Sequence, residues 1–107
     1  MDASSLNLTA RHAITNVSTL DGMWRERARL TPDKISHIDY LPKTQQRREY
    51  TWGQMLAETA RWQAALQKEN LQAGDRVAIM LRNCIEWPLY DQAALALSLV
   101  VVPLYTV

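Results

Sequence analysis

The sequence predicts an α/β fold, in which a β-hairpin and helices lead into a βαβ unit of a parallel sheet. Three successive segments indicate the βαβ unit. Residues 76–81 are an almost unbroken apolar run of strand length, as expected for a strand that is covered on both faces. Apolar residues then recur at helical spacing over residues 87–97. Residues 100–102, three valines, form a second apolar strand before Pro103, and the crossover between the strands should be right-handed.

The first half of the chain predicts one helix followed by the hairpin. Residues 1–18 are polar and aperiodic, and we expect a mobile tail there. The first helix should start at Thr19-Leu20-Asp21-Gly22 and end near Thr31, because Pro32 disfavours helical geometry in the residue before it. Residues 34–41 alternate in polarity and predict a strand, residues 42–46 a turn, and residues 47–51 the partner strand.

Two capping boxes predict the starts of the next two helices, because a cap residue is followed three positions later by Glu or Gln. They pair Thr51 with Gln54 and Asn83 with Glu86. The helix after Thr51 should run to about Asn70, and Gly74 should turn the chain into the next strand. We expect one face of this helix to be buried, with alanines filling between larger side chains: Trp52, Met55, Leu56, Thr59, Trp62 and Leu66, with Ala60, Ala64 and Ala65.

Composition limits the class of protein. A chain of 107 residues, 48% hydrophobic and 21% charged, is at most one globular domain. Its formal net charge of +1 gives no reason to expect nucleic acid as a partner. One cysteine excludes an intramolecular disulfide and suits a reducing cytoplasm. No apolar run approaches the ~20 residues that span a bilayer, so we expect a cytoplasmic protein without a membrane span and leave peripheral membrane contact open.

The candidate site positions follow the two strands of the βαβ unit, since ligands of open α/β sheets bind beyond the carboxyl ends of strands. They are residues 82–84 after the first strand and residues 105–106 after the second. Arg82 could face an anion, but no glycine accompanies it to form a phosphate-binding loop. Asn83 is explained by capping. Cys84 is better explained as a small buried side chain, because no His or second Cys stands near it in the sequence.

Other polar residues have structural explanations too. His37 lacks metal-ligand neighbours and is expected to be a half-exposed strand residue, and His12 falls in the predicted tail. Three arginines at alternate positions of the first helix spread over its faces as a solvated surface: Arg25, Arg27 and Arg29. We therefore assign no catalytic, no cofactor-binding and no metal-binding residue in this chain.

Short motifs in a fixed order carry a family resemblance. They are Pro32-Asp33-Lys34, Tyr50-Thr51-Trp52, Gly74-Asp75-Arg76-Val77-Ala78-Ile79, Asn83 with Glu86-Trp87, and Val101-Val102-Pro103-Leu104. In this order the chain resembles the early part of adenylate-forming (AMP-binding) acyl-CoA synthetases, most of all the long-chain fatty acid–CoA ligases. The resemblance covers about residues 20–105. Ser98 departs from it, standing where the family usually has Gly, and so does the ending Thr106-Val107.

The resemblance implies that residues 19–107 are an incomplete N-terminal α/β subdomain, part of the large N-terminal domain of an AMP-dependent ligase. The parent enzyme would activate a carboxylic acid, preferably a long-chain fatty acid, with ATP and Mg²⁺ through an acyl-adenylate, and would pass the acyl group to coenzyme A. The family's phosphate loop, adenine motifs and C-terminal lysine lie downstream. The chain itself is therefore expected to be an inactive scaffold that binds no cofactor tightly, with the remainder of the ligase as its partner.

An alternative is a stand-alone, non-catalytic α/β module that binds a ligand or dimerises. It is favoured by the lack of any catalytic motif and by the apolar closing strand, whose free edge could pair with a second copy to form a homodimer. Nucleotide binding by the chain alone would favour the module over the ligase fragment.

Overall fold

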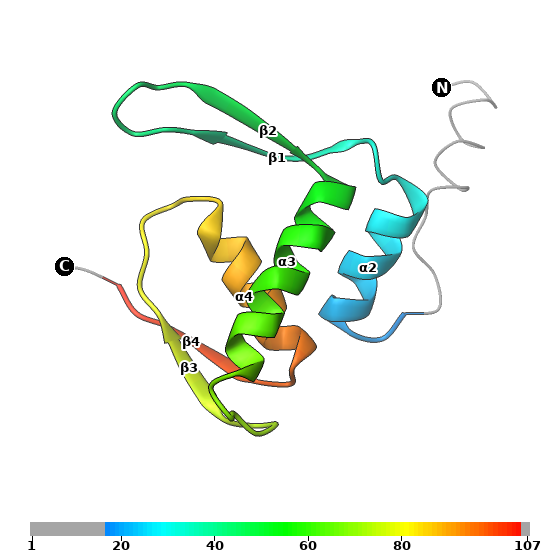
Figure 1. Ribbon diagram of the computed structural model, residues 1–107, viewed down its shortest axis with the longest axis vertical. Coiled ribbons are helices and arrows are strands. Elements are labelled where there is room, and N and C mark those ends of the chain that lie inside the picture. The colour runs from blue at the N-terminus through cyan, green and yellow to red at the C-terminus, as the bar shows by residue number, and fades with distance from the viewer. Residues whose placement is uncertain (1–16, 106–107) are drawn as a thin grey trace.

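The structure, a computed structural model, describes residues 17–105. The predicted tail, residues 1–18, lies outside the described residues except for its last two, and so does His12. Seven elements follow one another along the chain: α2 (Leu20–Leu30), β1 (Ile35–Tyr40), β2 (Arg47–Thr51), α3 (Trp52–Gln67), β3 (Arg76–Ile79), α4 (Glu86–Ala96) and β4 (Val100–Pro103). Figure 1 shows α3 in the centre, with the hairpin at one end and the β3–β4 pair near the other.

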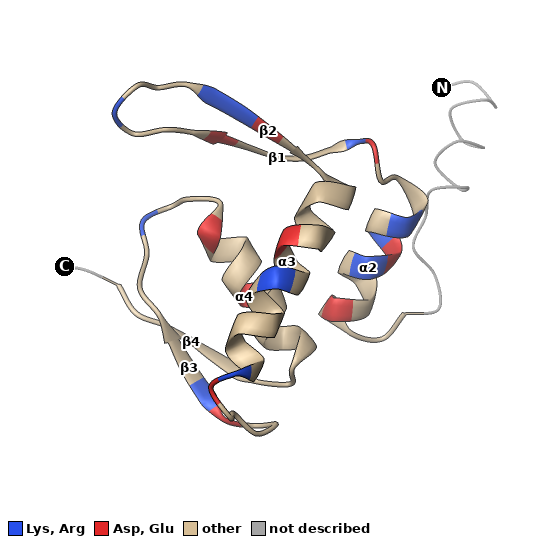
Figure 2. Ribbon diagram, in the orientation of Figure 1, with Lys and Arg blue, Asp and Glu red and all other residues tan. Residues whose placement is uncertain are grey.

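Helix α2 begins as predicted. The Thr19 side chain accepts a hydrogen bond from the backbone N–H of Gly22 at 2.9 Å. The helix ends where the backbone N–H of Thr31 donates to the carbonyl of Arg27 at 2.9 Å, directly before Pro32. Two ion pairs line its solvent side, Arg25 with Asp21 and Arg29 with Glu26, so these arginines form the solvated surface that was expected (Figure 2).

The hairpin is confirmed as an antiparallel pair. β1 and β2 align Tyr40 with Arg47 and Ile35 with Thr51, and a register irregularity lies between Ile35 and His37. The start of α3 is tied back to the segment before β1, because the backbone N–H of Gly53 donates to the carbonyl of Pro32 at 2.9 Å. The hairpin is therefore anchored at its base, while its turn projects beyond the helices (Figure 1).

The capping box of α3 is confirmed, with Thr51 Oγ1 accepting from Gln54 N at 3.1 Å and Gln54 Oε1 accepting from Thr51 N at 2.8 Å. The helix ends at Gln67, earlier than predicted, and Asn70 has a positive φ of 56° that takes the chain out of helical geometry. The buried residues of α3 are Met55 and Thr59. The expected filling role of the alanines is wrong, because Ala60, Ala64 and Ala65 are exposed.

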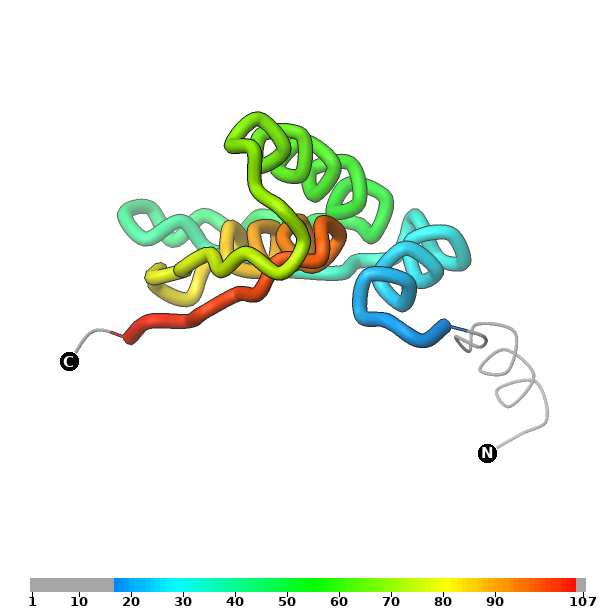
Figure 3. Tube along the Cα trace, turned by 90° about the horizontal axis from the view of Figure 1, so that it is seen from below, coloured from blue at the N-terminus to red at the C-terminus, as the bar shows by residue number. Residues whose placement is uncertain are grey.

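The βαβ unit is confirmed. β3 and β4 are parallel, with Arg76 opposite Val100 and Ile79 opposite Pro103, and α4 connects them. β3 ends at Ile79, two residues before the predicted end, and Pro103 belongs to β4 instead of following it. Figure 3 shows α4 lying between α3 and the strand pair.

The capping box predicted at Asn83 is wrong. Helix α4 begins at Glu86 after Ile85, which makes no side-chain capping hydrogen bond. The chain instead forms a tight turn, in which the backbone N–H of Trp87 donates to the carbonyl of Cys84 at 3.2 Å. Pro88 then fits the first helical turn, because a backbone N–H at that position has no partner within the helix.

The core lies where α3 and α4 meet. Met55, Ile85 and Leu89 form the buried cluster, and three aromatic side chains pack against it: Trp24, Tyr50 and Trp62. The Trp62 ring meets the Tyr90 ring edge-on, with centroids 6.1 Å apart. In residues 17–105 no helix has both the length and the apolar character needed to cross a membrane.

Candidate functional site

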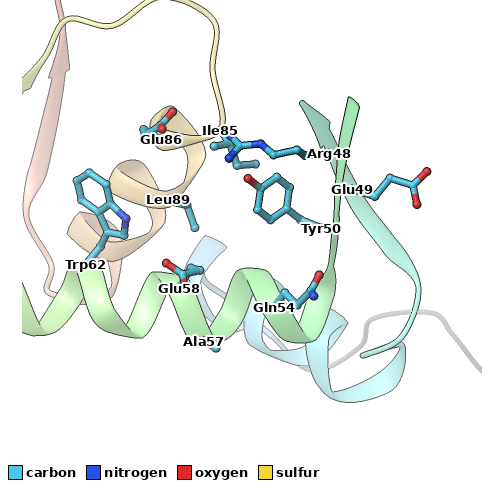
Figure 4. A pocket seen from close by; sticks show the side chains of 10 residues that line it. All are labelled: Arg48, Glu49, Tyr50, Gln54, Ala57, Glu58, Trp62, Ile85, Glu86 and Leu89. Atoms are coloured by element: carbon cyan, nitrogen blue, oxygen red, sulfur yellow. The ribbon is translucent and has the colours of Figure 1, made fainter. Parts of the chain in front are cut away.

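A hollow of about 480 Å³ lies where β2, α3 and α4 meet (Figure 4). Its buried or half-buried wall consists of Tyr50, Trp62, Ile85 and Leu89, and polar side chains stand around it: Arg48, Glu49, Gln54, Glu58 and Glu86. The helices supply the apolar wall because their facing sides form the core. The hairpin supplies Arg48 and Tyr50 because β2 runs directly into α3.

Three of the four charged side chains around this hollow are in ion pairs, and Glu86 is the exception among the described contacts. Arg48 Nη2 lies 3.1 Å from Asp39 Oδ2, and its guanidinium lies 5.7 Å from the centre of the Tyr50 ring. Glu49 pairs with Arg47 at 2.7 Å and Glu58 with Arg61 at 3.0 Å. An ion or substrate would have to compete with these contacts. The hollow has the size of a small-molecule site, but it lacks the nucleophile with a neighbouring base that covalent chemistry uses.

The residues at the carboxyl end of β3 do not form a site. Arg82 and Asn83 are exposed, and Arg82 Nη1 donates to the carbonyl oxygen of Asn83 at 3.4 Å. Cys84 was expected to be buried, but it is only half-buried. Burial, and then the Glu86 side chain, raise the pKa of the Cys84 thiol. The backbone N–H groups of Glu86 and Trp87, at the start of α4, lower the pKa of the thiol, but burial and the Glu86 side chain outweigh them.

A second hollow, of about 410 Å³, is lined by His37 and Cys84 among other residues, which sequence reasoning did not predict. His37 lies in β1 and Cys84 in the turn before α4, far apart in the chain, so no local pattern could reveal that they line one hollow. Burial lowers the pKa of the His37 imidazole, while Cys84 has a raised thiol pKa. Both groups are therefore uncharged at neutral pH, and they do not form the thiolate–imidazolium pair of a reactive cysteine.

His37 has a packing role, in line with the expectation of a half-exposed strand residue. Its ring lies 5.7 Å from the Trp24 ring and 6.2 Å from the Trp52 ring, measured between centroids, and its Nδ1 is 2.6 Å from Ser36 Oγ. Within the described part of the chain, no group of three or more His, Cys, Asp or Glu side chains is placed to hold a metal ion.

The fold agrees with the comparisons to known proteins. A sequence model of the AMP-binding enzymes matches residues 24–107. The chain therefore belongs to the AMP-binding enzyme family. A search of curated proteins gives no match.

Several solved structures share the fold. The chain is 26% identical to the fatty acid AMP ligase from Legionella pneumophila, with a TM-score of 0.72, over 81% of this chain and 15% of that one. It is 30% identical to the Mycobacterium tuberculosis fatty acyl CoA synthetase, with a TM-score of 0.67, over 80% and 16%. For IdnL1 the values are 25% identity, a TM-score of 0.75, and coverage of 87% and 19%.

These structures confirm the predicted fold class. A mixed α/β unit with a hairpin and a parallel strand pair matches the N-terminal domain of adenylate-forming enzymes. The chain spans only 15% to 19% of the length of these three proteins. The remaining length of such enzymes has no counterpart in this chain.

Proposed function

We propose that this chain is the N-terminal segment of an AMP-forming acyl-CoA ligase, in which it serves as scaffold. The observation that carries the proposal is the family match over residues 24–107, which includes nearly all the described elements. The paired charges of the hollow at β2, α3 and α4 and the protonated Cys84 thiol support a scaffold role.

The proposed reaction of the parent enzyme has two steps. The carboxylate of the substrate attacks the α-phosphate of ATP, which forms an acyl-adenylate and releases pyrophosphate. The thiol of coenzyme A then attacks the acyl carbon, which forms the thioester and releases AMP. Mg²⁺ would neutralise charge on the phosphates in the first step.

The described residues do not fit ATP or Mg²⁺. Residues 17–105 present no acidic cluster able to hold a metal ion, and the loop after β3 contains no glycine to cradle phosphates. In this proposal, neither step uses residues of this chain. ATP, Mg²⁺ and coenzyme A would be held by the remainder of the ligase, which is the partner we propose for the chain, in the cytoplasm.

A long-chain fatty acid is the substrate that we propose. Support comes from two of the similar structures, which are described as a fatty acid AMP ligase and a fatty acyl CoA synthetase. The first of these descriptions concerns an AMP ligase, so the acceptor thiol is the part of the proposal that an experiment should test separately.

The experiment uses the complete polypeptide that contains this chain. Carboxylate-dependent exchange of pyrophosphate into ATP tests the first step across fatty acids of increasing length. Coenzyme A-dependent release of AMP tests the second. We expect exchange with long-chain acids and thioester formation with coenzyme A. If no carboxylic acid in a broad set supports exchange of pyrophosphate into ATP, the ligase proposal is contradicted. If exchange occurs without thioester formation, only the proposal of coenzyme A as acceptor is contradicted.

A non-catalytic module that dimerises through the strand edge is the second candidate. The exposed apolar residues of β4, Val100 and Val102, favour it. Sedimentation of the 107-residue chain distinguishes the candidates. A stable, saturable dimer would favour the module, and open-ended association or a monomer of low stability would favour the ligase segment.

A further inference from the structure

A third hollow, of about 240 Å³, lies between α2, the start of α3 and α4. The residues that line it are Leu20, Met23, Trp24, Arg27, Trp52 and Gln92. Its wall is mostly apolar, and α2 contributes side chains that are only partly covered, since Leu20 is 58% exposed and Met23 is 44% exposed. Val17, three residues before Leu20, is 37% exposed. This side of α2 therefore offers apolar surface to a further segment.

Two of the lining residues carry a buried polar atom that lacks a hydrogen-bond partner within residues 17–105. They are the indole Nε1 of Trp24 and the amide Oε1 of Gln92. The first atom is a donor and the second is an acceptor. A buried polar atom without a partner destabilises the fold, so an occupant of this hollow should both accept and donate hydrogen bonds. A polypeptide backbone does so at every residue except proline, through its C=O and N–H groups.

The size of the hollow also favours a peptide over a small molecule. Sites for small molecules have volumes of about 300–1,000 Å³, and the hollow between α2, α3 and α4 is smaller than that range. A peptide segment needs room for only one or two of its side chains, because the rest of the segment can lie over the surface of α2.

Residues 1–16 are within reach of this hollow, because they lead directly into α2 through Val17. Val17 already lies against the first turn of the helix, since a Cβ atom added at Gly22 would meet Val17 Cβ at 3.7 Å. Met23 is six residues beyond Val17, which corresponds to about 9 Å along a helix. An extended chain covers about 3.3 Å per residue, so roughly three or four residues are enough to reach the hollow.

We propose that the hollow between α2, α3 and α4 is the seat of the chain's own N-terminal segment, residues 1–16. Its apolar anchors are the large apolar side chains that follow Met1: Leu6, Leu8 and Ile14. Backbone groups of the segment pair with Trp24 Nε1 and Gln92 Oε1. A tethered segment has an effective concentration on the order of millimolar, which favours it over the same segment of a second copy. This proposal departs from the mobile tail that the polar sequence predicts.

The test uses the complete polypeptide that contains this chain, in a background without its native cysteines. Leu20→Cys reports on the hollow. Arg29→Cys is the matched control, because the Arg29 side chain is 68% exposed on the same helix and does not line the hollow. Both are labelled with a maleimide in native buffer, with residues 1–16 present or deleted. We expect the deletion to speed labelling of Leu20→Cys about tenfold and to leave Arg29→Cys unchanged.

Two further variants separate the anchors from the hydrogen bonds. Leu6→Ser, Leu8→Ser and Ile14→Ser combined should act like the deletion, whereas Asn7→Ser and Thr9→Ser combined should not. Trp24→Phe removes the N–H donor and keeps an aromatic ring. It should speed labelling of Leu20→Cys about threefold when residues 1–16 are present and have no effect when they are deleted.

Equal labelling of Leu20→Cys with and without residues 1–16 would overturn the proposal. Slow labelling in both cases would mean that another part of the polypeptide covers the hollow, and fast labelling in both would mean that the hollow is open. Protection that disappears on dilution would overturn the intramolecular seat in favour of a second copy. Protection that persists in the combined serine variant of the anchors would overturn their role. Labelling does not depend on activity, so these outcomes are independent of the proposed ligase function.

Discussion

The backbone at Ser98 explains why glycine is expected at this position. It has a positive φ of 58°, directly after Leu97, which caps the end of α4. The backbone N–H groups of Ser98 and Leu99 donate to the carbonyls of Leu95 and Ala94, both at 3.0 Å. This is the Schellman arrangement, whose left-handed position is usually glycine. The Gly that the family usually has at this position therefore has a physical reason, and Ser98 adopts the same backbone at a cost.

Replacing Ser98 with glycine should stabilise the chain. A left-handed conformation costs a residue with a Cβ atom about 1 kcal/mol, and glycine adopts it freely. We expect Ser98→Gly to raise the free energy of unfolding by about that amount in urea titrations. Ser98→Ala keeps the Cβ atom and is the matched control. An equal gain in both variants would show that the backbone conformation is not the cause.

His37 makes stability depend on pH. Burial lowers its pKa below the ordinary value of 6.5, so the folded chain releases this proton more readily than the unfolded chain does. Between the two pKa values the unfolded state binds more protons, and stability falls as the pH falls through that window. The stabilisation by neutral His37 is fully present above pH 6.5.

Acidification from neutral pH to a pH below 6.5 should therefore lower the melting temperature of the chain. His37→Gln carries no titrating group and should lose part of this dependence, although it should also lose packing against Trp24 and Trp52. The readout is the slope of melting temperature against pH in each protein, and not the absolute melting temperature. Equal slopes for both proteins would mean that His37 is not the group responsible.

At the scale of elements, α3 carries the core through Met55, which is fully buried against Ile85 and Leu89. Met55→Ala should lower the free energy of unfolding by ~2–5 kcal/mol, because it removes buried contacts and leaves a cavity. Met23→Ala is the control, since Met23 is an exposed methionine on α2 and should change stability by at most about 0.5 kcal/mol. Similar losses in both variants would contradict the placement of the core.

Element types were predictable from local sequence, whereas their ends depended on tertiary contacts. Thr51 and Gln54 are neighbours in a helical turn, so the start of α3 could be predicted from spacing alone. The start of α4 could not, because Asn83 and Glu86 have the spacing of a capping box while the helix begins after Ile85 without a side-chain cap. The exposure of Ala64 and Ala65 was also not predictable, because an apolar helix face does not show whether a neighbouring element covers it.

At the scale of the whole molecule, the sequence predicted the arrangement of hairpin, helices and parallel pair. It did not predict that one face of β3–β4 is bare, because the apolar run of β3 indicated burial on both faces. The predicted burial on both faces of β3 and the bare face in the structure agree if the bare face is covered by polypeptide outside the described residues. That His37 and Cys84 line one hollow could not be predicted for a different reason, since it arises from long-range folding without a local pattern.

The mass of the native polypeptide tests whether this chain is part of a longer ligase. Antibodies against residues 17–105 would recover the protein from its own cells for intact mass measurement. We predict a mass several times the 12.3 kDa of this chain, consistent with coverage of 15% to 19% of the similar proteins. A mass close to 12.3 kDa would contradict the account and would favour the stand-alone module.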